Sequence, residues 1–195
     1  MGIRVLGGEH RSRVLKTLKG DDTRPTRSLV REASFNLLKG LYEGGRVLDL
    51  FAGSGALGIE ALSRGAQHAV FCDNSREAAR VIHENLGLLR LTDQSTVLQM
   101  DWKLALKRLT TQTERFDLVL LDPPYVMDAG IILKEVSFAD ILSKQGIILL
   151  EQAANTQFEC CAGLETIKSK RYGDTAVYLF TREEASVESD LPGQL

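Results

Sequence analysis

Asp122, Pro123, Pro124 and Tyr125 form the most distinctive chemical motif of the chain. Two consecutive prolines fix the backbone and remove two N–H donors, so the loop is rigid and displays acceptors. The Asp122 carboxylate and the Pro123 carbonyl oxygen can both accept from an exocyclic amino group of a base. Accepting those hydrogens directs the nitrogen lone pair at a methyl donor, and Tyr125 offers a face on which the base can stack. An ordinary turn after a strand is the alternative. The motif predicts a catalytic loop for methylation of a base amine.

A turn of small residues follows the apolar segment 47–50 and points to a second ligand. Gly53 and Gly55 permit a tight turn that lies close against a ligand. A helix beginning near Ala56 would direct its unpaired N–H groups at that ligand. The spacing from Gly53 to Gly58 also matches the dinucleotide fingerprint, so the turn alone predicts only a nucleotide-like ligand.

Two carboxylates near this turn favour S-adenosylmethionine over NAD. Asp73 lies 20 residues after Gly53, where it can accept from the ribose hydroxyls of an adenosine, as either cofactor would require. Asp49 places a negative charge just before the turn, which would repel a pyrophosphate and attract an ammonium group. S-adenosylmethionine has an amino group and no phosphate, and its product would be S-adenosylhomocysteine. No Cys or His spacing predicts a metal site.

Strand and helix patterns alternate from Arg46 onward. This alternation predicts an α/β fold with a parallel sheet and helices on both faces. The expected strands are 46–50, 69–73, 95–99, 116–121 and 146–151, followed by a hairpin of 165–170 and 175–181. The helices between them run from the glycine turn to 64, from Ser75 to 86, from Asp101 to 109 and over 131–142. Ligands lie beyond the carboxyl ends of such strands, where Asp49, Asp73, Asp101 and Asp122 are expected to face one crevice.

The N-terminal region is basic. Residues 1–31 hold eight Lys or Arg and three Asp or Glu, although the whole chain has a net charge of −2. A basic arm on an acidic body predicts a polyanionic partner. We expect a small hairpin of strands 3–6 and 13–16, a polar loop over 19–25, and a helix from Thr26 to Tyr42 that Gly44 and Gly45 end. The predicted organisation is an extension over 1–44, a catalytic domain over 45–182 and a disordered acidic tail over 183–195.

Composition also predicts where the protein works. No run of about 18 apolar residues could span a membrane, and the N-terminus lacks the apolar region of a signal peptide. The three cysteines suit a reduced compartment. We expect a cytoplasmic, monomeric protein without a membrane partner.

Together these motifs resemble the class I S-adenosylmethionine-dependent methyltransferases that modify base amines, and most closely the bacterial RsmD-type 16S rRNA guanine-N2 methyltransferases. The resemblance covers roughly residues 3–182. The segments that carry it are 4–11, 22–26, 30–33, 35–36, 49–58, 59–65 and 122–125. Ser34 departs from the pattern, because the family usually has a larger apolar residue there.

The resemblance implies a Rossmann-like fold with a seven-stranded, mostly parallel sheet whose last strand is antiparallel. It implies methylation of N2 of the guanine conventionally numbered 966, in 16S rRNA of the small ribosomal subunit or its assembly intermediate. The residues expected to bind the cofactor are Asp49, Phe51, Ala52, Gly53, Ser54, Gly55, Asp73, Asn74, Asp101 and Trp102. Those expected to contact RNA are Arg4, His10, Arg11, Arg13, Lys16, Arg24, Thr26 and Arg27.

Three other functions remain open from the residues alone. An adenine-N6 methyltransferase acting on DNA or another RNA would use the same 122–125 loop. An NAD-dependent oxidoreductase would use the same glycine turn, but no obvious proton donor for it is present. A non-catalytic RNA-binding module would have no need for the intact 122–125 loop.

Overall fold

The computed structural model describes residues 2–18, 25–156 and 163–183 of the chain. Its strands are β1 (Ile3–Arg4), β2 (Val14–Leu15), β3 (Gly45–Asp49), β4 (Ala66–Asp73), β5 (Ser95–Gln99), β6 (Phe116–Leu121), β7 (Leu142–Ala153), β8 (Leu164–Tyr172) and β9 (Thr175–Arg182). Its α-helices are α1 (Pro25–Leu37), α2 (Ala56–Ser63), α3 (Arg76–Leu89), α4 (Trp102–Thr111) and α5 (Ala129–Phe138), and a 3₁₀ turn covers Thr92–Gln94.

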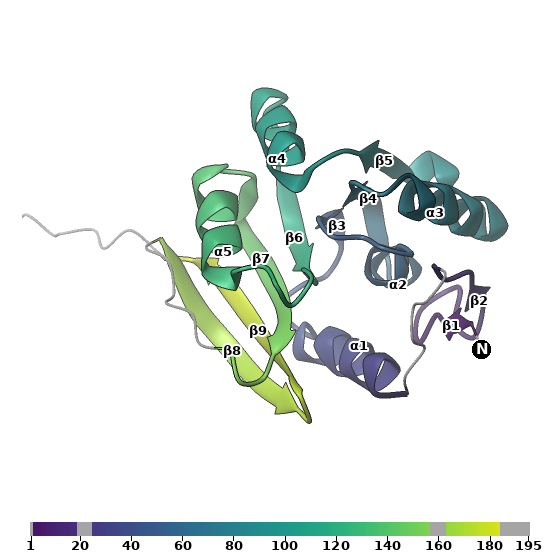
Figure 1. The fold of residues 1–195 in the computed structure, drawn as a ribbon, viewed down its shortest axis with the longest axis horizontal. Coiled ribbons are helices and arrows are strands. Elements are labelled where there is room, and N and C mark those ends of the chain that lie inside the picture. Colours follow the sequence, from purple (N-terminus) through teal and green to yellow (C-terminus); the bar gives the residue numbers. More distant parts are fainter. Residues whose placement is uncertain (1, 19–24, 157–162, 184–195) are drawn as a thin grey trace, which may run out of the picture.

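Seven of these strands form one twisted sheet in the order β5-β4-β3-β6-β7-β9-β8 (Figure 1). Strands β3 to β7 are mutually parallel, whereas β9 runs antiparallel to both β7 and β8. The expected seven-stranded Rossmann-like sheet with an antiparallel last strand is therefore confirmed. Among the described strands, β8 lies at one edge of the sheet, and all its residues from 165 to 171 are exposed.

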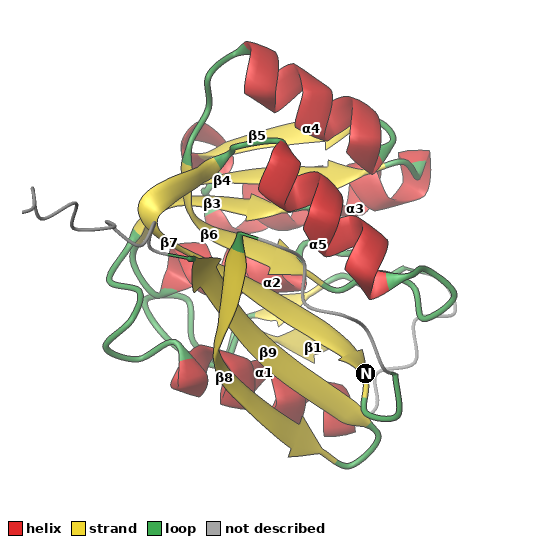
Figure 2. Ribbon diagram, turned by 90° about the vertical axis from the view of Figure 1, so that its left-hand side faces the viewer, coloured by secondary structure: helices red, strands yellow, loops and turns green. Residues whose placement is uncertain are grey.

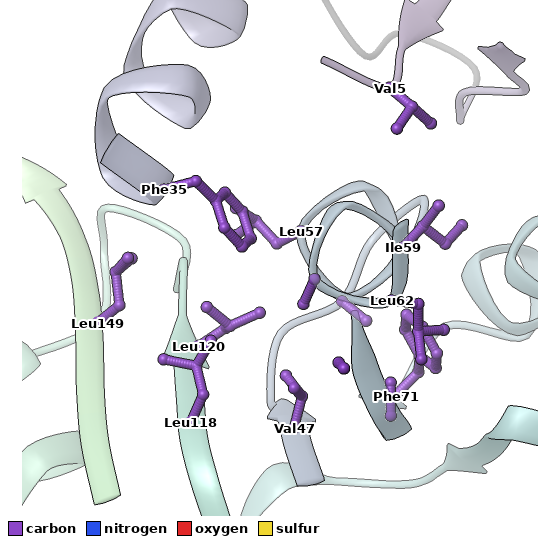
Figure 3. Packing of buried hydrophobic residues seen from close by; sticks show 14 of the residues in the cluster. Val5, Phe35, Val47, Leu57, Ile59, Leu62, Phe71, Leu118, Leu120 and Leu149 are labelled. Carbon is purple, nitrogen blue, oxygen red and sulfur yellow. The ribbon is translucent and has the colours of Figure 1, made fainter. Parts of the chain in front are cut away.

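Helices cover both faces of the sheet, and α4 and α5 lie in front of it in Figure 2. The sheet is apolar on both sides because parallel strands are buried between helices. Alternate residues of the central strands supply the two cores. Leu118 and Leu120 face the core shared with α1, α2 and α3, where Phe35 packs beside them (Figure 3). Leu121 faces the other core, with α4 and α5.

The N-terminal hairpin is present, with strands of two residues rather than the four expected on each side. So short a hairpin is not stable alone, and it is held by the body of the protein. Val5 and Leu15 are buried in the same core as α2 and α3. The backbone N–H of Leu6 donates to the buried Glu60 carboxylate at 2.8 Å.

Helix α1 ends earlier than predicted, at Leu37 rather than Tyr42. Gly40 adopts a left-handed backbone with a φ of 74°, which a helix cannot continue through. Two other predicted boundaries are confirmed, because Ser75 caps α3 and Asp101 caps α4 through side-chain oxygens. The predicted 19–25 loop, apart from Pro25, and the tail beyond 183 lie outside the described residues. Within the described ranges, no helix has both the length and the apolar character needed to cross a bilayer.

Candidate active site

A cleft of about 1010 Å³ opens at the carboxyl ends of the parallel strands. It lies where the strand order reverses, since the chain leads from β3 to β4 on one side and β6 pairs with β3 on the other. Ligands of open α/β sheets bind at this position. The cleft is lined by segments 50–54, 56–57, 73–74, 100–102, 122–125 and 153–155, and by Met127 and Glu151. Residues of α1, of the N-terminal segment and of the turn between β8 and β9 complete the lining.

The three glycines of the turn after β3 serve different purposes. Gly53 and Gly55 adopt left-handed backbones with φ of 53° and 81°, which other L-residues rarely tolerate. A Cβ on Gly53 would meet no atom within 4 Å, so this residue faces open space in the cleft. A Cβ on Gly58 would lie 2.3 Å from the Phe71 ring, so Gly58 is required for close packing of α2 on β4.

Asp73 holds the turn and also faces the cleft. Its Oδ2 accepts from the Gly53 N–H at 2.9 Å, and its Oδ1 accepts from the Ser75 N–H at 2.9 Å. A carboxylate oxygen has two lone pairs, so each can accept a further hydroxyl. Asp73 is therefore fixed in place with acceptor capacity left for a ligand, and Asn74 lines the cleft beside it.

Aromatic side chains line the neighbouring wall. The rings of Phe51 and Trp102 are 5.8 Å apart at an angle of 47°, and both residues line the cleft. Asp101 also lines it, while its Oδ1 accepts from the N–H groups of Lys103 and Leu104 at 2.9 and 3.4 Å. This wall has the shape and apolar character to receive a planar heterocycle.

Asp49 does not face the crevice, contrary to expectation. It is fully buried, and its Oδ2 accepts from the Gly58 N–H at 2.9 Å. Burial raises the pKa of Asp49 to about 7. The hydrogen bond from Gly58 opposes this rise, and the negative charges of Asp122 and Asp73 add to it. The Asp49 side chain points to the start of α2 rather than into the cleft. Gly55 likewise does not line the cleft. A direct role of either residue in cofactor binding stays a prediction.

The 122–125 loop forms the opposite rim. All four residues line the cleft, and the Pro124 carbonyl oxygen accepts from the Met127 N–H at 2.9 Å, which closes the loop as a turn. Tyr125 is 61% exposed, which leaves its ring available for stacking. The structure therefore brings the predicted catalytic loop and most of the predicted cofactor residues to one cleft.

Glu151 also lines this cleft, and the sequence reasoning missed it. It lies on β7 and accepts from the Ser34 hydroxyl of α1 at 2.9 Å. Burial first, and then the Asp122 carboxylate, raises the pKa of Glu151, while the Ser34 hydrogen bond and the Arg31 charge oppose the rise. The signal was the same as for Asp73 and Asp122, an acid at the carboxyl end of a buried strand. The unusual Ser34 is thus explained by a polar partner.

Asn85 is a second residue that the sequence did not single out. Its Nδ2 donates to the carbonyl oxygens of Ser54 and Lys16, both at 3.0 Å, and its Oδ1 accepts from the Lys16 N–H at 2.8 Å. One fully buried side chain therefore joins the glycine turn to the hairpin. No local pattern predicts a contact between residues 69 positions apart.

The predicted RNA contacts are spread over two places. Arg27 lines the cleft, whereas the others that are described lie on the hairpin: Arg4, His10, Arg11, Arg13 and Lys16. Lys16 pairs with Glu84 at 2.8 Å, so its charge is partly compensated. Arg24 and the side chain of Thr26 lie outside the described residues. Within the described part of the chain, no cluster of three or more His, Cys, Asp or Glu side chains could hold a metal ion.

Comparison with known proteins identifies the family. The profile of the family described as "Conserved hypothetical protein 95" matches residues 3–181. The chain belongs to this family. It is 36% identical to the putative rRNA methyltransferase YlbH of Bacillus subtilis, over 92% of this chain and 99% of that protein. It is 32% identical to ribosomal RNA small subunit methyltransferase D of Escherichia coli, over 96% and 93% of the two chains.

Solved structures agree. The structure described as putative methyltransferase yhhF from Escherichia coli has a TM-score of 0.76 and 30% identity, and the match covers 95% of this chain and 100% of that one. Membership of the Conserved hypothetical protein 95 family and the fold together confirm the predicted resemblance to RsmD-type enzymes. The chain is a methyltransferase of this family.

Proposed function

We propose that the protein transfers a methyl group from S-adenosylmethionine to N2 of a guanine in small-subunit rRNA. The observation that carries this proposal is the convergence in one cleft of the turn around Gly53, the fixed carboxylate of Asp73 and the 122–125 loop. The first two suit an adenosine-containing methyl donor, and the third suits a base amine.

The cleft fits the cofactor in three respects. Gly53 has no side chain in the cleft and leaves the backbone open to close approach. Asp73 has acceptor capacity for ribose hydroxyls, and Phe51 and Trp102 offer apolar surface for the adenine ring. We infer that Ala52, Ser54, Asn74 and Asp101, which also line the cleft, complete the cofactor site.

Positioning supplies most of the catalysis in this proposal. The N2 lone pair forms a bond to the methyl carbon as the sulfur–methyl bond breaks, and that bond's electron pair stays on sulfur. The positive charge passes from sulfur to nitrogen, which then loses a proton to Asp122 or to water. Holding the amine and the methyl group in line lowers the activation barrier by at most about 7–11 kcal/mol.

The substrate assignment rests on charge and on the relatives. The names of both relatives describe rRNA methyltransferases, and one is named for the small subunit. The exposed Arg11 and Arg13 of the hairpin are suited to phosphate contacts, which position an RNA without reading its sequence. Guanine must then be selected within the cleft and by the shape of the RNA.

Adenine N6 is the nearest competing acceptor, because the 122–125 loop can hold either amine. A single experiment separates the two. The protein is incubated with tritiated S-adenosylmethionine and small subunits from cells that lack this enzyme, and the label is mapped by nuclease digestion and mass spectrometry. We expect N2-methylguanosine at one site. Labelled N6-methyladenosine would overturn the base assignment, and an absence of label on any nucleic acid would contradict the proposed activity.

A further inference from the structure

Two carboxyl groups leave neighbouring strands at the same level of the cleft. Strands β6 and β7 are parallel, with Leu121 paired to Leu150. Asp122 and Glu151 each follow these residues by one position, so they emerge side by side on the same face of the sheet. Both line the cleft. The proposed function uses Asp122 and leaves Glu151 without a role.

Glu151 is held in place from α1. The Ser34 hydroxyl, which is fully buried, donates to its Oε1 at 2.9 Å. Arg31, one helical turn earlier and 6% exposed, supplies a favourable charge. Asp122 and Asp49 face it with unfavourable charge, and burial adds to the cost of ionisation, so the pKa of Glu151 is raised. A further N–H donor brought by a ligand would stabilise the ionised carboxylate.

Guanine supplies such a donor and adenine does not. The N2 amine of guanine is bonded to the ring carbon C2. The neighbouring ring nitrogen, N1, carries a hydrogen. In adenine the corresponding N1 carries no hydrogen and accepts. A pair of adjacent carboxylates therefore matches the N1–H and N2 edge of guanine, whereas one of the two would face the N1 lone pair of adenine.

We propose that Glu151 selects guanine by accepting the N1–H of the target base while Asp122 holds the N2 amine. This proposal rests on the proposed function, because it names how the same cleft distinguishes bases. Ser34 and Arg31 are positioning residues that act through Glu151.

The test uses 2-aminopurine, which retains the 2-amino group but has no hydrogen on N1. Small subunits are reconstituted from 16S rRNA in which the methylated guanosine found in the mapping experiment is replaced by 2-aminopurine riboside. Methyl transfer is compared with subunits that carry guanosine. For the unchanged protein we expect guanosine to be preferred roughly 10- to 100-fold, the effect of leaving a charged acceptor unpaired.

Glu151→Gln is the decisive variant because an amide can donate to the bare N1 of 2-aminopurine. We expect its preference for guanosine to fall at least tenfold relative to the unchanged protein. Intrinsic differences between the two bases cancel in this comparison. Asp122→Asn is the matched control, and it should slow transfer to both bases equally because both carry the amine. Ser34→Ala, which leaves Glu151 in place without its hydrogen bond, should lower the preference several-fold.

Binding of S-adenosylhomocysteine and the melting temperature establish that each variant is folded. If Glu151→Gln does not fold, the preference of Ser34→Ala for guanosine over 2-aminopurine tests the role of Glu151. An unchanged preference in the folded variants overturns the role of Glu151, even where the protein methylates guanine N2 normally. If the unchanged protein does not methylate subunits that carry guanosine, the proposed function is contradicted. The proposed selection of guanine by Glu151 is then contradicted as well.

Discussion

At the scale of single residues, the cleft uses carboxylates in different electrostatic settings. Asp73 is satisfied by two backbone N–H groups and keeps acceptor capacity. Asp49 is buried away from the cleft, and Asp122 and Glu151 lie next to each other in its lining. The setting of each carboxylate, rather than its residue type, determines which can act on a ligand.

Asp122→Ala should reduce methyl transfer by about 100-fold or more, as expected for the removal of one positioned hydrogen bond to the reacting group. The cofactor is held by other residues, so its affinity should change by no more than a few-fold. Single-turnover transfer and calorimetric binding of S-adenosylhomocysteine measure the two effects. Asp93→Ala, an exposed acid in the 3₁₀ turn, is the control and should have normal activity. Near-normal turnover of Asp122→Ala would refute the assigned role.

Asp49 should make the free protein less stable as the pH rises. Because its pKa is raised from 3.8 to about 7, the folded chain keeps a proton that the unfolded chain has lost. The free energy of unfolding should therefore fall between about pH 4 and pH 7, by on the order of 4 kcal/mol from this group. Asp49→Asn should flatten that part of the profile in urea unfolding experiments. An identical pH profile for the variant would show that Asp49 is not the cause.

At the scale of elements, the turn after β3 depends on contacts from far along the chain. The Asn85 side chain on α3 binds both the carbonyl of Ser54 and the backbone of Lys16. The hairpin, which is too short to be stable alone, and the turn, which lines the cleft, are therefore fixed by the same residue.

Asn85→Ala should lower the free energy of unfolding by about 2–4 kcal/mol, because the buried Ser54 carbonyl and two partly buried backbone groups of Lys16 would be left without their hydrogen-bond partner. It should also weaken S-adenosylhomocysteine binding at least several-fold, since Ser54 lines the cleft. Thermal unfolding and calorimetry give the two values. Glu84→Ala is the matched control on the same helix, because it removes only the surface ion pairs with Lys16 and Arg80, and it should leave both nearly unchanged. Equal behaviour of the two variants would contradict a positioning role for Asn85.

Local patterns predicted most of these elements, and the exceptions have physical causes. The apolar runs and the caps at Ser75 and Asp101 are local, so the sequence located the strands and helices to within a few residues. Helix α1 ended early because a single glycine took a left-handed backbone. The burial of Asp49 and the pairing of Glu151 with Ser34 depend on how distant segments pack, and no spacing rule contains that information.

At the scale of the whole molecule, charge is unevenly placed. Ile3 and Leu18 of the N-terminal segment line the cleft, and the basic hairpin extends from there to the far end of α2, where the backbone N–H of His10 donates to the Ser63 hydroxyl. The RNA proposed as substrate would thus meet Arg27 in the cleft and further positive charge on the hairpin alongside α2. Phosphate neutralisation makes such binding depend on salt.

Arg11→Gln with Arg13→Gln should weaken binding of small-subunit RNA and reduce the slope of log affinity against log salt by roughly 0.7–0.9 for each phosphate that is no longer neutralised. The slope is measured by titration at several salt concentrations. Replacing Lys107 and Lys144, two exposed lysines on α4 and at the start of β7, is the charge-matched control and should leave the slope unchanged. A slope that stays the same in both pairs would mean that the hairpin does not bind RNA phosphates.

The free edge of the sheet also affects how copies of the protein meet. The backbone of β8 faces solvent and is a template on which a strand of another molecule could add. Lys168, Lys170 and Arg171 on this strand outnumber its one acid, Glu165. Two β8 strands placed together would bring like charges face to face, and this repulsion opposes polymerisation through the sheet. We therefore expect the protein to stay dispersed when concentrated, and to lose that property when these three cations are neutralised.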